Sequence, residues 1–396
     1  MSYKADLYIM LPCIQTEKIN FQTTEHNYGK LFKNELDKAA AYEFDRDLNI
    51  TIDRYVLREI SLLCRTDDRE NPECLGQQEA FITISQYKDT NFCLFMIVIV
   101  NVKENLLTYF LDQTSRGELY ITEPEMSLHT WMEDTFKLKP TGKAFFASCM
   151  SELPNTVETK NILSAEAYHK DNDYFIVSKT TETNLNENHA QYSHYDAYMS
   201  ERGIIYIMKE FDETYPERLQ TECIMLFIME LIVLKITAIN IANDAINKAY
   251  TKEEVLTKDI LEILENFAKS MPLWETQHFR YFLAQEFANK VESSFKVSRY
   301  LADYERSRIQ LEQIVNIRKI NTSEKETRVV TFFATILAIG QIIPISRAIE
   351  FNKSDSWGNI LKQNTAPIIT LIIIVVFTTW FFFGKKIKMK MKQIFR

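Results

Sequence analysis

Hydrophobic and polar positions alternate in two different ways along this chain. Over residues 1–212, short apolar runs rich in β-branched residues alternate with polar segments, which predicts a mixed α/β domain with buried strands. Strands are predicted at Ala5–Met10, Phe81–Ser85, Phe92–Val102, Leu106–Leu111, Glu118–Ile121, Tyr174–Val177 and Ile204–Met208. Helices are predicted at Leu31–Tyr42 and Ser127–Phe136.

From about residue 213 to 272 the pattern becomes helical. Glu217–Tyr250 is predicted to form one long helix, whose apolar centre carries the charged residues Glu230 and Lys235. These two charges disfavour membrane insertion by several kcal/mol, so we expect the helix to be buried in the folded domain or in a subunit contact. Lys252–Ser270 is predicted to be an amphipathic helix that ends before Pro272, because proline cannot continue the hydrogen-bond ladder.

A stretch without helix breakers follows. Residues 273–339 contain neither glycine nor proline, and a single helix of that length would span roughly 100 Å. Its apolar positions recur every three or four residues, at Leu283, Phe287, Val291, Phe295, Leu301, Tyr304, Leu311 and Val315. This seam predicts a stalk helix over residues 273–328 that neighbouring copies bury. The polar triplet at residues 321–323 is the one place where we expect a break.

Two uncharged apolar runs come last, at Val329–Ile345 and Ala366–Phe383. Each is close to the roughly 20 residues that a helix needs to cross a bilayer. They predict two membrane helices joined by a loop at residues 346–365. Trp357 and Trp380 fit anchors at the membrane interface. The alternative is a pair of helices buried in a soluble core.

The C-terminal tail, residues 384–396, is strongly basic. It contains no acidic residue, and its positive charges are Lys385, Lys386, Lys388, Lys390, Lys392 and Arg396. Positive charge next to a membrane segment marks the cytoplasmic side, with Lys385 and Lys386 at the membrane surface. We therefore expect a multi-pass protein of the inner (plasma) membrane, with both termini in the cytoplasm.

Charge and motif content exclude several function classes. The formal net charge is −8 even with this tail included, so the remainder is acidic and nucleic acid is not an expected partner. The six cysteines form no CxxC pair, which favours free thiols. The six histidines have no metal-ligand spacing, and phosphate-loop and nucleophile-elbow motifs are missing. We therefore expect no enzyme activity, and neither ligand-binding nor metal-binding residues can be assigned.

An α+β cytoplasmic domain, a long stalk helix, a two-helix membrane hairpin and a lysine-rich tail form an unusual order. This order resembles the CorA family of divalent-cation channels over the whole chain. The resemblance implies a funnel-shaped homo-oligomer, usually a pentamer, in which the stalk and first span surround a pore for Mg²⁺ or another divalent cation. The family's Gly-Met-Asn signature is missing here, where the corresponding stretch, residues 338–344, reads AIGQIIP.

CorA-like proteins associated with type III CRISPR systems share this layout and can lack the triplet. The resemblance to that branch implies a cytoplasmic sensor for a nucleotide second messenger, a conjugate of S-adenosylmethionine and AMP (SAM-AMP). It also implies that the membrane part acts as an antiviral effector.

One face of the first span carries small and polar residues at three- and four-residue steps. They are Thr327, Thr331, Thr335, Ala338 and Gln341. They line a pore in one interpretation and a close helix–helix contact in the other. Glu350 and Asp355 are candidates for an outer mouth that draws in cations, although a solvated loop also carries such charges.

Three function classes therefore stay open. The first is a ligand-gated CorA-like channel or effector, with a divalent-cation transporter as its variant. The second is a membrane-anchored binding module. The third is a membrane-anchored enzyme, which the missing catalytic motifs disfavour.

Overall fold

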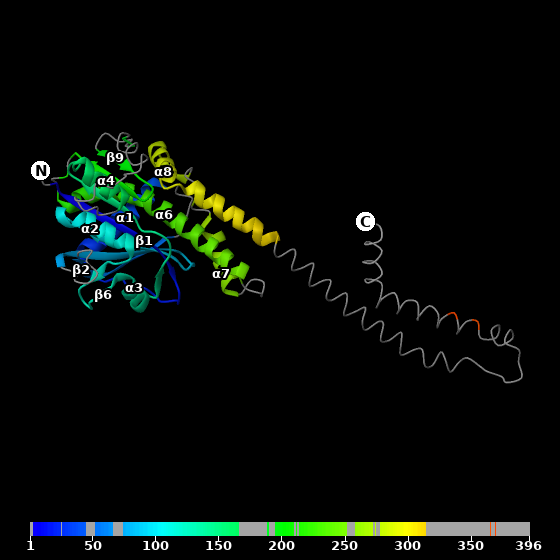
Figure 1. Cartoon of the computed structure of the whole chain (residues 1–396). Helices are drawn as coiled ribbons and strands as arrows, with labels where there is room; N and C mark the ends of the chain where they lie inside the picture. Colours follow the sequence, from blue (N-terminus) through cyan, green and yellow to red (C-terminus); the bar gives the residue numbers. More distant parts are fainter. Residues whose placement is uncertain are drawn as a thin grey trace, which may run out of the picture. The chain divides into compact units, whose positions relative to one another are not determined.

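The computed structural model describes residues 3–24, 26–44, 52–65, 74–165, 188–189, 195–209, 211, 214–251, 258–271, 274, 278–313, 365 and 369. The chain divides into two compact units, residues 1–311 and 312–396. The fold below is that of the first unit (Figure 1). The predicted strand at Tyr174–Val177, the triplet at 321–323, the first apolar run and the basic tail lie outside the described residues. The second run does too, apart from Ile369.

The centre of the first unit is a ten-stranded mixed sheet of order β6-β5-β2-β3-β4-β1-β8-β10-β9, with β7 paired to β1. The strands are β1 (Ala5–Gln15), β2 (Ile52–Arg65), β3 (Cys74–Tyr87), β4 (Phe92–Ile99), β5 (Tyr120–Ile121), β6 (Met126–Ser127), β7 (Leu138–Pro140), β8 (Phe145–Met150), β9 (Tyr195–Met199) and β10 (Gly203–Met208). Neighbouring strands are antiparallel except for the β8–β10 pair.

Helices cover both faces of this sheet. They are α1 (Asn27–Glu43), α2 (Glu104–Arg116), α3 (Leu128–Phe136), α4 (Thr156–Ser164), α6 (Tyr215–Thr251), α7 (Lys258–Ser270) and α8 (Phe282–Ser294), and residues 297–313 are also helical. Successive side chains of β1 enter opposite layers: Tyr8 and Met10 pack with α1, α6 and α8, and Leu7 and Ile9 pack with α2, α3 and α4. Burial on both faces explains why the sequence of β1 is a continuous apolar run.

Most of the regular elements predicted in this half are confirmed. The predicted strands at Ala5–Met10, Phe81–Ser85 and Ile204–Met208 lie in β1, β3 and β10, and the two predicted helices coincide with α1 and α3. The strand predicted at Phe92–Val102 ends earlier, at Ile99, and only the last two residues of Glu118–Ile121 are a strand.

The strand prediction at Leu106–Leu111 is wrong, because this segment lies inside helix α2. Leu106, Leu107, Phe110 and Leu111 are all buried. Their spacing of one, three and four residues places them on one side of a helix. A short apolar run has the same composition in a buried strand and a buried helix, so its period was ambiguous over six residues.

The long apolar helix α6 is the core of the first unit. Among the described residues it is the one helix long and apolar enough to cross a membrane, yet 89% of that apolar window is buried inside the domain. This confirms the prediction of a buried helix. Its charged residues Arg218, Glu222, Glu230 and Lys235 are at most 8% exposed. Buried charges need partners, and α6 finds them on the elements around it.

One of these buried charges joins three other elements. Glu230 accepts hydrogen bonds from Arg54 Nε at 3.0 Å and from Arg54 Nη2 at 2.5 Å, and Ser85 also donates to it. Arg54 Nη1 donates to Asp37 at 2.7 Å. The pair therefore connects α6 with β2 directly, and with α1 and β3 through Asp37 and Ser85.

The prediction of one uninterrupted helix from residue 273 is wrong. The helix α8 begins at Phe282 and ends at Ser294, and Lys296 adopts a left-handed backbone conformation with φ of 55° before helix resumes at residue 297. Phe287, Val291 and Phe295 are buried in the same core as α6. Up to Leu311, the predicted seam is therefore largely covered by the domain itself.

We expect Arg54→Met to lower the free energy of unfolding by about 3–5 kcal/mol, since it leaves Glu230 charged and unpaired in the core. Arg306→Met is the matched control, because Arg306 has 72% of its side chain exposed. That change should cost less than about 0.5 kcal/mol. Denaturant unfolding of both variants measures the difference, and equal losses would show that the buried pair does not hold α6 in place.

Candidate functional site

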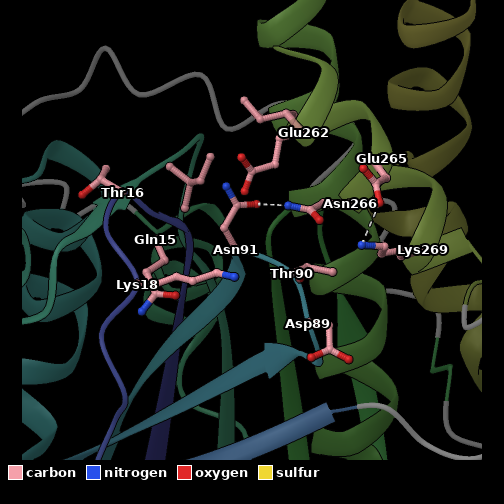
Figure 2. A pocket seen from close by; sticks show the side chains of 12 residues that line it. Gln15, Thr16, Lys18, Asp89, Thr90, Asn91, Glu262, Glu265, Asn266 and Lys269 are labelled. Carbon is pink, nitrogen blue, oxygen red and sulfur yellow. Dashed lines mark hydrogen bonds and ion pairs between the residues drawn. The ribbon is translucent and has the colours of Figure 1, made fainter. Parts of the chain in front are cut away.

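The candidate site is a pocket of about 640 Å³ between one end of the sheet and helix α7 (Figure 2). Three segments supply its walls. They are the end of β1 with the residues after it (Ile14, Gln15, Thr16, Lys18), the β3–β4 turn (Asp89, Thr90, Asn91) and α7 (Glu262, Ile263, Glu265, Asn266, Lys269).

The turn between β3 and β4 is held rigidly by its own hydrogen bonds. Asp89 has a φ of 58°, a left-handed conformation that aspartate tolerates better than most residues. The Thr90 hydroxyl donates to Tyr87 O at 2.8 Å, and the Gln86 amide donates to Thr90 O at 2.5 Å. The backbone N–H of Gln15 donates to Asn91 O at 2.8 Å. The sheet end is thus a preorganised wall of the pocket.

Helix α7 forms the opposite wall through its amphipathic pattern. Phe267 is 3% exposed and faces the core, and Glu262, Glu265 and Lys269 line the pocket. Asn266 Nδ2 donates to Asn91 Oδ1 at 3.0 Å, and this bond joins α7 to the turn across the pocket (Figure 2). Asn266 is 5% exposed, so this contact is partly shielded from water.

The chemistry of the pocket is that of a site for a polar ligand carrying both signs of charge. Amide and hydroxyl groups provide donors and acceptors. Two lysines, Lys18 and Lys269, also line the pocket, together with the carboxyl groups of Asp89, Glu262 and Glu265. Lys269 pairs with Glu265 at 3.0 Å. Lysines can contact a phosphate, but three carboxyl groups disfavour a polyanion such as a triphosphate.

The same helix contacts the segment that leads out of the domain. The rings of Phe267 and Tyr304 are 4.6 Å apart at their centroids. Leu311 packs with Ala245 of α6 in a small cluster that includes Ile263 of α7. Ile263 also lines the pocket. One short helix therefore touches both the pocket and residues 304–311.

A second polar cluster is fully enclosed. Arg218 Nη2 donates to Asp6 at 2.6 Å, and Tyr8 donates to Glu222. Asp6, Tyr8 and Glu222 are 0% exposed. Burial, and next the charge of Asp6, raise the pKa of Glu222 from 4.5 to about 8. Arg218 is 4% exposed, so all four side chains are buried, and we assign the cluster to the stability of the domain.

The predicted membrane-side residues lie outside the described residues, so their mutual geometry stays a prediction. These are the pore candidates Thr327, Thr331, Thr335, Ala338 and Gln341, the mouth candidates Glu350 and Asp355, and the anchors Trp357, Trp380, Lys385 and Lys386. Within the described part of the chain, no group of three or more His, Cys, Asp or Glu side chains is placed to hold a metal ion. The cysteines are free thiols, and all but Cys74 are buried.

Sequence reasoning assigned none of the pocket residues. They come from three segments, near residues 14–18, 89–91 and 262–269, and none forms a known motif. The one available signal was the polar face of the amphipathic helix at its C-terminal half.

Comparisons with family models, with curated proteins and with solved structures found no match to this chain.

We expect the free energy of unfolding to fall as pH rises from 5 to 7.5, because folded Glu222 keeps its proton up to about pH 8 and the unfolded side chain loses it near pH 4.5. This group alone contributes roughly 1.4 kcal/mol per pH unit. Glu222→Gln should remove that part of the slope. Exposed Glu305 provides the matched control, Glu305→Gln, which should keep the wild-type slope. Identical slopes for all three proteins in denaturant unfolding would show that Glu222 is ionised in the fold.

Proposed function

We propose that this protein is a CorA-like membrane effector, whose cytoplasmic domain binds a small nucleotide ligand and thereby gates or perturbs the membrane. The observation that carries the proposal concerns helix α7. Some of its residues line the pocket, and its Phe267 packs on Tyr304 in the segment that precedes the apolar runs. A domain that only tethers a binding module to a membrane needs no such connection. The two apolar runs that follow in the sequence supply the membrane-spanning hairpin.

The ligand that we propose is the messenger SAM-AMP, and the biological role is antiviral defence in a type III CRISPR system. The pocket chemistry supports this choice over a plain nucleotide. SAM-AMP combines adenine bases and a phosphate with a sulfonium cation, which suits a pocket with both lysines and carboxyl groups. ATP carries several negative charges and meets three carboxyl groups there, so its binding is expected to be weak.

Assembly into a homo-oligomer is part of the proposal. A pore needs several copies of the first span, and the small and polar face at Thr331, Thr335 and Gln341 suits either a pore lining or a contact between spans. A silent effector must favour its closed state by several kcal/mol. To change the ratio of open to closed protein from 1:99 to 99:1, the ligand must then bind the open state more tightly by about 5.5 kcal/mol.

The topology can be tested with an impermeant thiol reagent on intact cells. Ser354→Cys, in the loop at residues 346–365, should react from outside. Cys74 is the exposed native thiol and serves as the internal control. It should react only after permeabilisation, because the domain is expected to be cytoplasmic. Labelling of Cys74 in intact cells would show that the domain lies outside the cell and that the proposed orientation is wrong.

The division into sensor and pore predicts two separable classes of variant. Thr331→Leu and Gln341→Leu should change ion flux in vesicles and leave SAM-AMP binding to the purified protein intact. Lys18→Ala should weaken that binding about tenfold, or about 1.4 kcal/mol. Exposed Lys139 on β7 provides the control Lys139→Ala.

Two outcomes would contradict the proposal. SAM-AMP binding unchanged in Lys18→Ala would remove the pocket from the sensor. Loss of binding in Thr331→Leu, with normal flux, would reverse the assignment of the two parts.

A further inference from the structure

On the pocket side α7 is attached to the sheet end by a hydrogen bond, and on its apolar side it packs against α6 and the core. The Asn91–Asn266 hydrogen bond joins the helix to the β3–β4 turn across the space that a ligand would occupy. The turn is held in place by bonds to Gln15, Gln86 and Tyr87. Of the two partners, α7 is therefore the one that can move when the bond breaks.

Both side chains of this bond are primary amides. An asparagine amide offers an acceptor oxygen and two donor hydrogens in one plane, which matches the adjacent donor and acceptor on the edge of an adenine base. The two amides are 3.0 Å apart when they bond to each other. The bond uses the Nδ2 donor of Asn266 and the Oδ1 acceptor of Asn91. A base that pairs with these same two atoms takes the place of the bond.

Loss of this hydrogen bond can affect residues 304–311 through side-chain contacts of α7. Asn266 precedes Phe267, whose ring packs on Tyr304 at 4.6 Å. Ile263, one helical turn earlier, lines the pocket and packs in the cluster that contains Leu311. A displacement of α7 therefore alters the packing of residues 304–311 at two points.

We propose that the Asn91–Asn266 pair is a latch: it holds α7 closed in the resting protein, and an adenine base opens it by taking over both amides. The released helix then loosens residues 297–311 through the Phe267–Tyr304 contact. This inference rests on the proposed function for its ligand. The latch itself is a property of the ligand-free domain and can be tested without the ligand.

The test is hydrogen exchange, read by mass spectrometry, on the full-length protein in detergent without ligand. Asn91→Ala should speed exchange about fivefold in residues 258–271, the factor expected for loss of one hydrogen bond of about 1 kcal/mol. Exchange in residues 297–311 should rise with it. Asn266→Asp has nearly the same shape, loses the donor and adds a negative charge beside the Asn91 oxygen, so it should reproduce both effects. Asn34→Ala, on the exposed face of α1, is the matched control.

A second variant tests the relay. In the Tyr304→Leu background, Asn91→Ala should still speed exchange in residues 258–271 but should speed it less in residues 297–311, where the cluster of Ile263 and Leu311 remains. If Asn91→Ala and Asn266→Asp both exchange like Asn34→Ala, there is no latch. If residues 297–311 respond equally with and without the Tyr304 ring, the relay runs elsewhere.

A ligand arm separates this inference from the proposed function. Saturating SAM-AMP, with binding followed by calorimetry, should speed exchange of residues 297–311 in the wild type, as Asn91→Ala does without ligand. Binding without any such change would overturn the opening of the latch by the base and leave the sensor intact. No binding, together with the expected effects of Asn91→Ala, would overturn the proposed ligand and leave the latch intact.

Discussion

The structure depends on the burial of one long helix that is both apolar and charged. Helix α6 packs against β1, β4 and β8 of the sheet, and four of its ionisable residues are buried with it. Three of its buried charges are matched by groups on different neighbours: Asp6 of β1 for Arg218, Arg54 of β2 for Glu230, and Glu292 of α8 for Lys235. Mismatched packing would leave buried charges unpaired at a cost of several kcal/mol. We infer that these pairs specify where α6 lies more than they add to net stability.

The placement of α6 in turn determines where α7 and residues 304–311 can pack. Ala245 and Ala249 near the end of α6 form a small apolar surface that Ile263 and Leu311 cover. Helix α7 thus packs on α6 through apolar side chains and reaches the end of the sheet through a hydrogen bond. The apolar side of α7 is buried, and its other side is held by polar contacts. Local opening of α7 at the pocket is therefore expected to cost much less free energy than global unfolding.

The proposed function uses this contrast between the apolar packing of α7 on the core and its polar attachment at the pocket. A messenger can act on a membrane pore only through its difference in affinity for two arrangements of the protein. A polar latch is suited to such a difference, because a polar ligand can replace its hydrogen bond at little cost. The apolar contact between Phe267 and Tyr304 suits the relay, because close-packed side chains transmit displacement to their neighbours.

The sequence by itself determined the α+β character of the first unit, several of its strands and helices, and the buried position of α6, because apolar period and length are local properties of the chain. It did not determine that Leu106–Leu111 is helical or that helix α8 ends at Ser294, since tertiary packing decided between local patterns of similar energy. The pocket belongs entirely to the tertiary structure. Its residues are remote in sequence, and only the pairing of β1 with β4 and the docking of α7 place Asn91 against Asn266.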